Sequence, residues 1–245
     1  FYNMKYRGLK TASLNDEITA TEDINKVTAV PKSEYAYIMD WDDYYAPSAL
    51  YYMQSKGVIA ASAFKPFSSK TNLGNKDFNY GSIMIPVSKQ QKLSSDKVYE
   101  IVREAQTKFN VPIYASNSGF SVKGIDLGSN NFRTVKKPKV AMLVGDGVSS
   151  YEAGEVWHLL DTRTKMPITK LQTNTIRGNW LDKYNTLVMV SGSYSSLDSI
   201  QRQNIRDWTA NGNTLITIGS ASKWAVDRKL VKEKLTTKHK PKDKD

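Results

Sequence analysis

The feature that most constrains the fold is a series of short apolar runs in the second half of the chain. The runs at 139–144, 167–171, 186–190 and 214–218 are rich in branched residues, a pattern typical of strands buried on both faces of a parallel sheet. Segments with helical spacing separate them, and one of these ends at Asn211-Gly212, a common helix stop. Strands that alternate with helices predict a doubly wound α/β sheet, here with strand order 2-1-3-4.

The first half of the chain shows a similar alternation. The expected elements are, in order, a strand at 35–40, a helix from Pro47 to Gly57, a strand at 58–64, a polar loop from Pro66 to Lys76, a strand at 81–87, a helix from Val98 to Phe109, and a strand at 111–115. The opening β-α-β order favours a right-handed crossover and parallel neighbours. We therefore expect a chain of two α/β units.

The expected divisions of the chain follow from these patterns. We expect an irregular segment at 1–34, a first α/β unit at 35–130, a second α/β unit at 131–230 and a Lys-rich tail at 231–245. The turn-rich stretch 116–138 is expected to hold the linker. Because the chain opens with neither an initiator Met nor a signal-peptide core, we interpret it as an excised fragment or a mature product.

Charge and composition exclude several classes of protein. The net charge is +11, but the segment from Arg228 to Asp245 holds eight basic residues against three acidic ones, so the body of the chain is only mildly basic. We therefore expect no nucleic-acid partner. No apolar run approaches the roughly 20 residues of a transmembrane helix. The absence of Cys excludes disulfides, thiolate metal sites and a Cys nucleophile.

Four motifs carry a resemblance to a known family. They are Gly124-x-Asp126-Leu127-Gly128-Ser129, Pro138 to Gly145, Gly154 to Asp161, and Asp207 to Ala221. Together they resemble the C-terminal regions of bacterial zinc carboxypeptidases of the carboxypeptidase A and T type. In such proteins a metallopeptidase domain comes first, and the last part is similar to the class I glutamine amidotransferase fold. The resemblance implies an amidotransferase-like, flavodoxin-like second unit, an upstream metallopeptidase domain as partner, and an exported parent protein.

The zinc ligands of that family do not follow from the resemblance. Zinc carboxypeptidases use a His-x-x-Glu pair and a distant His, because an open site needs three protein ligands and a water. This chain has two His. His158-x-x-Asp161 imitates the pair but belongs to an expected helix, and His239 lies in the tail. We expect no metal and no other cofactor in this chain, with zinc held by the upstream domain.

One turn invites a catalytic interpretation. Class I amidotransferases carry a Cys on the sharp turn after a central strand, and the turn from Ile218 to Trp224 puts Ser220 in that place. A serine needs a base, and the expected downstream His-x-Glu is absent. Ser220 is therefore a weak catalytic candidate, and we interpret it as a helix N-cap.

Three loops are expected at the carboxyl edge of the second sheet, where doubly wound sheets bind ligands. The candidate ligand-binding residues there are Gly145, Asp146, Gly147, Ser193, Tyr194 and Ser220. The first loop lacks the third Gly of the dinucleotide fingerprint and any basic residue, which favours a plain tight turn. Ser149-x-x-Glu152 then predicts a capping box at the start of a helix.

Three carboxylates stand among aromatic residues from Asp40 to Tyr45. This composition suits a cation or a sugar ring, or contact with a neighbouring domain, and we favour the contact. The leading functional hypothesis is a non-catalytic accessory module of an exported metallocarboxypeptidase. The alternatives are a small-molecule binding domain at the carboxyl edge of the second sheet and a Ser-dependent amidase or hydrolase that uses Ser220.

Overall fold

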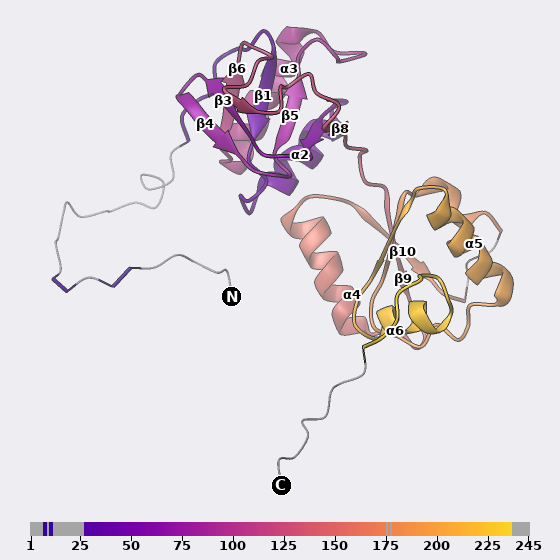
Figure 1. The fold of residues 1–245 in the computed structure, drawn as a ribbon. Coiled ribbons are helices and arrows are strands. Elements are labelled where there is room, and N and C mark those ends of the chain that lie inside the picture. The colour runs from indigo at the N-terminus through magenta and orange to yellow at the C-terminus, as the bar shows by residue number, and fades with distance from the viewer. Residues whose placement is uncertain (1–6, 9, 12–26, 175, 177, 237–245) are drawn as a thin grey trace.

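The computed structural model describes residues 7–8, 10–11, 27–174, 176 and 178–236. Figure 1 shows the described residues from 27 onward as two units, each built from helices and strands. Most of the expected irregular segment 1–34 lies outside the described residues, as does the end of the Lys-rich tail with His239.

The first unit contains two helices and eight strands among its described residues. They are β1 (Ala36–Met39), α2 (Ala46–Ser55), β2 (Ala61–Ala63), β3 (Phe67–Thr71), β4 (Gly74–Phe78), β5 (Ile83–Pro86), α3 (Ser95–Phe109), β6 (Ile113–Ser116), β7 (Lys123–Gly124) and β8 (Phe132–Thr134). Local chemistry sets the limits of α3: Ser94 accepts a hydrogen bond from the Lys97 N–H, and Asn110 ends the helix with φ of 51°.

The main sheet of the first unit is antiparallel, so the expected parallel pairing is wrong. Its order is β6-β1-β5-β2-β8. β5 lies between β1 and β2, with Tyr37 opposite Ile85 and Ser62 opposite Ile83. β1 and β2 both pair antiparallel with β5, so they run in the same direction but are not neighbours. After β2 the chain forms the β3–β4 hairpin and re-enters the sheet at β5 in the opposite direction.

The β3–β4 hairpin occupies the stretch where a polar loop was expected, and that expectation is also wrong. The strand β3 is polar in sequence, yet most of it is buried. Its polar side chains are paired inside the unit: the hydroxyl oxygens of Ser69 and Ser116 lie 3.1 Å apart, and the Thr71 hydroxyl donates to the Gly74 carbonyl. Hydrogen bonding therefore lets polar side chains enter a buried strand.

Three layers build the first unit. The helices α2 and α3 cover one face of the five-stranded sheet, around Tyr37, Ile85 and Met53. A three-stranded sheet of order β4-β3-β7 covers the other face, around Phe67 and Phe78.

The segment 116–138, expected as a linker, is largely part of the first unit. Its strand β7 pairs with β3, its strand β8 pairs with β2, and its Leu127 is buried. The turn residues of this segment serve close contacts: Gly124 has φ of 84°, and a Cβ there would lie 2.5 Å from the Pro66 carbonyl oxygen. The first sheet therefore runs past the expected division at residue 130.

The second unit contains a four-stranded parallel sheet. Its elements are β9 (Val140–Val144), α4 (Ser150–Trp157), the π-helix η1 (His158–Arg163), β10 (Ile168–Gln172), the 3₁₀-helix η2 (Trp180–Lys183), β11 (Thr186–Met189), α5 (Ser199–Ala210), β12 (Thr214–Thr217) and α6 (Ser220–Asp227). The sheet order is β10-β9-β11-β12, with all neighbours parallel. This is the predicted order 2-1-3-4.

Helices lie on both faces of the parallel sheet (Figure 1). The helix α4 packs on Met142 and Val188, and α5 and α6 cover the opposite face through Trp208 and Trp224. The strand β12 forms one end of the sheet, and its α4-side residues are poorly covered: Ile216 is 42% exposed and Ile218 beside it is 37% exposed. An apolar strip therefore remains open beside α4.

Candidate functional site

The strand β12 ends in a sharp turn into α6, and the strained residue of that turn is Gly219. Its φ of 57° and ψ of −127° belong to a region that favours glycine. In a nucleophile elbow the strained residue at the strand-to-helix turn is the nucleophile itself. The structure therefore has Gly219, and not Ser220, at the position from which a nucleophile would project.

A side chain at residue 219 would have to displace the hydroxyl of Ser191. A Cβ built on Gly219 would overlap the hydroxyl oxygen of Ser191 and would lie 3.7 Å from Oε2 of Glu152. Both groups are held in place, because Oε2 of Glu152 accepts a 2.8 Å hydrogen bond from the Ser191 N–H, and Oγ of Ser191 accepts a 3.1 Å bond from the Ser220 N–H.

Ser220 is the first residue of α6, and the N-cap interpretation is wrong. Gly219 occupies the N-cap position. The Ser220 hydroxyl oxygen instead accepts a 3.0 Å hydrogen bond from the Gly192 N–H on the loop after β11. Two backbone N–H groups beside the elbow, those of Gly192 and Ser220, thus both donate to serine hydroxyls. An oxyanion hole requires such donors to be available to substrate.

The capping box before α4 forms only in part. The Ser149 hydroxyl accepts a 3.3 Å hydrogen bond from the Glu152 N–H, as predicted. The Glu152 carboxylate does not return to the Ser149 N–H, because it accepts from Ser191, and the Ser149 N–H donates to the Ser191 carbonyl at 2.8 Å. The sequence pattern correctly predicts where the helix starts. The Glu152 carboxylate, however, bonds to Ser191 and so connects α4 to the elbow.

His158 lies at the far end of α4 from the elbow. It begins η1, is exposed, and stands six residues beyond Glu152, a rise of roughly 9 Å along a helix. Asp161 shares the same π-helical segment. Within the described residues, no three His, Cys, Asp or Glu side chains come together as a metal site would require.

Hydrogen bonds close the crevice that was expected between the loops after β9 and β11. The Ser193 N–H donates to the Gly147 carbonyl at 2.9 Å. Next to this bond, Val148 and Gly192 form an antiparallel bridge. The two predicted ligand residues Gly147 and Ser193 therefore contact each other where doubly wound sheets usually bind ligands.

Tyr194, also a predicted ligand residue, is part of the core. Its side chain is buried, its hydroxyl donates a 2.7 Å hydrogen bond to the Val190 carbonyl, and its ring centroid lies 5.5 Å from that of Trp224. Burial raises the pKa of the phenol well above its usual range, and the nearby Glu152 carboxylate adds to the rise. Asp146 is exposed on the adjoining loop.

A cavity of about 330 Å³ opens on the other side of β9, between α4 and the sheet. Of the six predicted ligand-binding residues, Gly145 lines it, together with Val144, Gly154, Trp157 and Lys170. Sequence reasoning missed Lys170, although strand alternation places it opposite Met142 and hence on the face that α4 covers. The ligand site that the geometry offers is therefore one strand away from the expected one.

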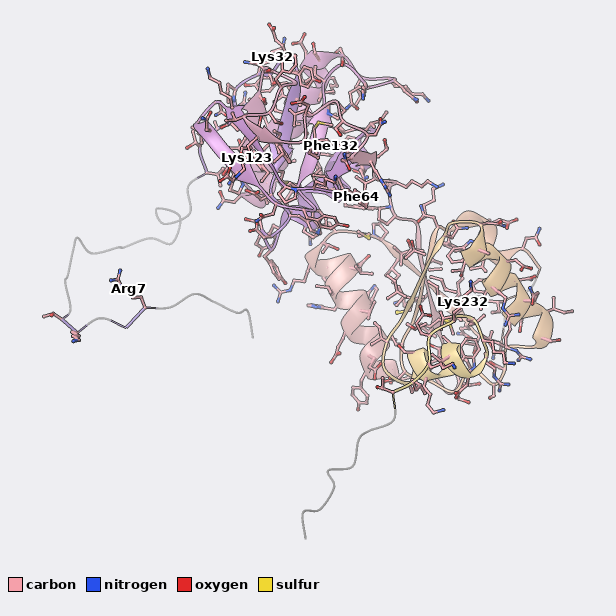
Figure 2. The ribbon with its side chains drawn as sticks, in the orientation of Figure 1. Arg7, Lys32, Phe64, Lys123, Phe132 and Lys232 are labelled. Carbon is pink, nitrogen blue, oxygen red and sulfur yellow. The ribbon has the colours of Figure 1, made fainter. Side chains whose placement is uncertain are left out.

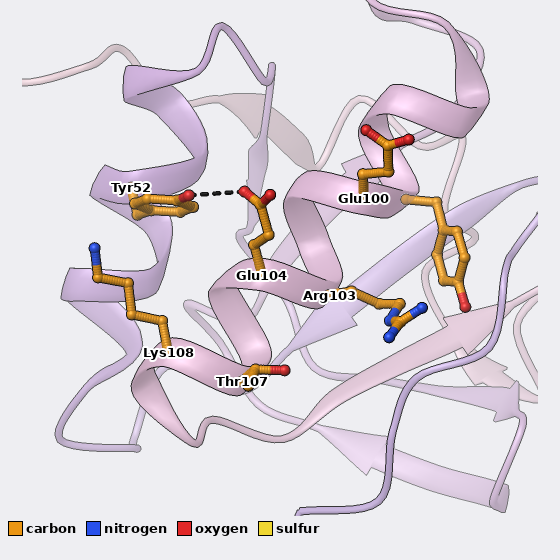
Figure 3. Close-up of a pocket in the computed structure, with 7 residues that line it drawn as sticks. Tyr52, Glu100, Arg103, Glu104, Thr107 and Lys108 are labelled. Atoms are coloured by element: carbon orange, nitrogen blue, oxygen red, sulfur yellow. Dashed lines mark hydrogen bonds between the residues drawn. The ribbon is translucent and has the colours of Figure 1, made fainter.

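A groove of about 510 Å³ lies in the first unit between α2 and α3 (Figure 3). The Tyr52 hydroxyl donates to Glu104 at 2.8 Å, and this bond raises the pKa of Tyr52. Lys108 lies over the Tyr52 ring at 4.9 Å, and Glu100 pairs with Lys97 at 2.6 Å. These paired charges are typical of a solvated helix face.

The carboxylates between Asp40 and Tyr45 do not converge on one point. Asp40 pairs with Lys76 at 2.9 Å, and Asp43 accepts a 2.8 Å hydrogen bond from the Tyr45 N–H. This arrangement gives no support to a cation site.

Exposed aromatic rings gather near the same end of the first sheet. Trp41 follows β1, Phe64 follows β2, and Tyr80 precedes β5. All three rings are partly exposed, and those of Phe64 and Tyr80 lie 5.5 Å apart. Figure 2 labels Phe64 close to Phe132, which begins the neighbouring strand β8. Such a surface suits contact with another domain.

The fold and the site define a two-unit α and β protein whose parallel sheet carries an elbow turn without a nucleophile side chain. Comparisons of the chain with family models, curated proteins and solved structures found no match. None of the helices in the described ranges combines the length and hydropathy of a membrane-spanning segment.

Proposed function

We propose that this chain is a non-catalytic accessory module of an exported zinc metallocarboxypeptidase. Proteolysis and zinc binding belong, in this proposal, to an upstream domain of the same polypeptide, and the second unit is a flavodoxin-like relative of class I glutamine amidotransferases. The four motifs that resemble such carboxypeptidases support the identity of the parent protein.

The turn at Gly219 is the observation that supports a non-catalytic role for this chain. The turn keeps the backbone strain of an elbow, but its strained residue has no side chain, and Ser191 fills the space that one would need. The two neighbouring N–H donors are engaged by Ser191 and Ser220. A turn of this kind supports a scaffold role, because neither attack by residue 219 nor stabilisation of an oxyanion is available.

Two apolar surfaces support the role as a partner of another domain. One is the strip of Ile216 and Ile218 beside α4, and the other is the aromatic group of Trp41, Phe64 and Tyr80. Clustered apolar side chains on a soluble protein commonly mark contact sites. An upstream domain that covers either surface would remove these side chains from water and stabilise both partners.

The test is to express this chain with the coding region that precedes it and to measure zinc and peptidase activity. The longer polypeptide is expected to hold one tightly bound zinc and to remove C-terminal residues from peptides. This chain alone is expected to do neither. A preceding region that lacks a His-x-x-Glu pair with a later His, or a longer polypeptide that binds no zinc, would contradict the proposal.

A second candidate function, small-molecule binding, is favoured by the cavity that Gly145 lines. The volume of about 330 Å³ is at the lower end of the range for ligand pockets. The third candidate, a Ser220-dependent hydrolase, requires the Ser220 hydroxyl to leave the Gly192 N–H and to find a base.

A further inference from the structure

The cavity between α4 and the parallel sheet has an apolar floor and one charged group at its rim. Val144, Val148 and Trp157 supply apolar walls, and Trp157 is 37% exposed. Lys170 extends over the Trp157 ring, with its ammonium nitrogen 4.4 Å from the ring centroid. Among the described residues that line the cavity, Lys170 carries the only formal charge.

Gly154 lies where α4 lines the cavity, and it is exposed. A glycine within a helix is about 0.5–1 kcal/mol less favourable than alanine, and Gly154 is the fifth residue of α4. A Cβ at this position would meet no heavy atom within 4 Å. The packing of this chain therefore does not require glycine there, and the empty volume is available to another molecule.

We propose that this cavity binds a small flat hydrophobic carboxylate, such as an aromatic acid. The ring lies against Trp157 and the floor at Gly154, and the carboxylate pairs with the Lys170 ammonium. Among the described lining residues, Ser149 and Ser150 are the polar side chains besides Lys170, and the Ser149 hydroxyl already accepts from the Glu152 N–H. These few polar partners favour a flat apolar ring over a sugar or a nucleotide, which need several. The ammonium selects an anion, and its position over the indole holds it at the rim.

The position of Lys170 also fits a second role, which the experiment must distinguish from ligand binding. It lies on β10, an end strand of the sheet, and an inward-pointing charge on such a strand protects the edge from pairing with another chain. That role requires no ligand. It predicts that removal of the charge changes aggregation and leaves the binding of an aromatic acid unchanged.

The inference rests on the second candidate function, small-molecule binding, and is independent of the accessory role. The probes are 2-naphthoate and its uncharged analogue 2-naphthamide, titrated into the whole chain by calorimetry and by NMR. We expect 2-naphthoate to bind with a dissociation constant of about 0.05–1 mM, as suits a ligand of this size. The amide is expected to bind about tenfold more weakly, because it forms no ion pair with Lys170.

Two variants and one control locate the binding. Gly154→Leu places a side chain in the open volume, so it should weaken both probes at least tenfold while the melting temperature is kept or raised. Lys170→Gln should weaken 2-naphthoate about tenfold and leave 2-naphthamide unchanged. Lys223→Gln, a change of an exposed lysine on α6, should alter neither.

The results distinguish a cavity that binds no ligand from a cavity that binds ligands without preferring carboxylates. If neither probe binds, or if Gly154→Leu binds both as well as the parent chain, the cavity is not a ligand site and the small-molecule function fails with it. If both probes bind equally and Lys170→Gln changes nothing, the cavity binds ligands, but the selection of carboxylates is wrong and Lys170 only guards the strand edge.

Discussion

The backbone N–H of Gly192 donates a 3.0 Å hydrogen bond to the hydroxyl oxygen of Ser220, which begins the helix after the elbow. A serine that acted as a nucleophile would instead pass its proton to a base and present a free oxygen to substrate. Here the oxygen accepts from a neighbouring loop and joins the ends of β11 and β12. Ser220 thus forms a contact between these two loops.

Replacement of Gly219 by alanine should destabilise the chain by about 2–5 kcal/mol. The positive φ alone costs about 1–2 kcal/mol for a residue with a Cβ, and the overlap with the Ser191 hydroxyl adds about 1–3 kcal/mol. Denaturant unfolding measures the loss. The matched control is Gly212→Ala, because Gly212 has φ of 86° and no heavy atom within 4 Å of its Cβ position, so it should cost only the backbone term.

A second change tests the source of that loss. Gly219→Ala combined with Ser191→Gly removes the overlapping hydroxyl and should recover part of the stability, despite the cost of the added glycine. Equal losses for Gly219→Ala and Gly212→Ala would show that the side chain at 219 has room, which would contradict the account of the elbow.

Ser220→Ala should cost about 0.5–1.5 kcal/mol, because it leaves the Gly192 N–H without its partner. This loss comes from the contact with Gly192 and not from a lost N-cap. A double-mutant cycle with Ser191→Ala tests whether the two serines act together. The two serines engage neighbouring loops of one turn, so their effects should couple by at least about 0.5 kcal/mol. Strictly additive losses would contradict a shared network at the elbow.

Stability should decline at alkaline pH because of Tyr194. Its pKa in the folded chain is raised by burial, so the folded state holds the neutral phenol. The stabilisation is complete below the unfolded pKa of about 10 and is lost as the pH rises above that value.

Melting temperatures between pH 8 and pH 12 measure this alkaline decline. Tyr194→Phe should lower stability by about 1 kcal/mol at neutral pH, through loss of the bond to Val190, and should make the alkaline decline shallower. The slope should remain in the control Tyr151→Phe, which alters an exposed ring. A decline that is equally steep without the Tyr194 hydroxyl would contradict this assignment.

The apolar strip of Ile216 and Ile218 should matter only when a partner is present. Ile216→Lys is expected to change the stability of this chain alone by no more than about 0.5 kcal/mol, because the side chain is already partly in water. In the longer polypeptide with the preceding domain, the same change should lower the melting temperature. Ile200→Lys is the control, since Ile200 is exposed on α5. Equal effects of both changes in the longer polypeptide would argue against the strip as a contact surface.

The second unit was more predictable from the sequence than the first. Its continuous apolar strands, such as 139–144, and their alternation with helices determine a parallel sheet, and the order 2-1-3-4 followed. In the first unit, β3 is polar in sequence yet mostly buried, because the Ser69 hydroxyl bonds to the Ser116 hydroxyl and the Thr71 hydroxyl donates to the Gly74 carbonyl. Hydropathy does not report such pairing, so the hairpin and the antiparallel sheet were missed.

The candidate site was predicted only at the level of the sheet edge. The sequence indicates a strand-to-helix turn near Ser220, but backbone strain depends on φ, and the strained residue is Gly219. The bridge between Val148 and Gly192 is a contact between distant loops and has no local signal. Strand alternation places Lys170 on the side of the sheet that α4 covers. The sequence carries no signal for the free volume at Gly154.

The central claim, that the elbow carries no nucleophile, is tested most directly by covalent labelling. The native chain is incubated with a fluorophosphonate, and intact mass spectrometry counts the adducts. We predict no adduct, because the Ser220 hydroxyl is held by Gly192 and residue 219 has no side chain. A single stoichiometric adduct that disappears in Ser220→Ala, together with loss of an esterase or amidase turnover, would contradict the account and establish the hydrolase alternative.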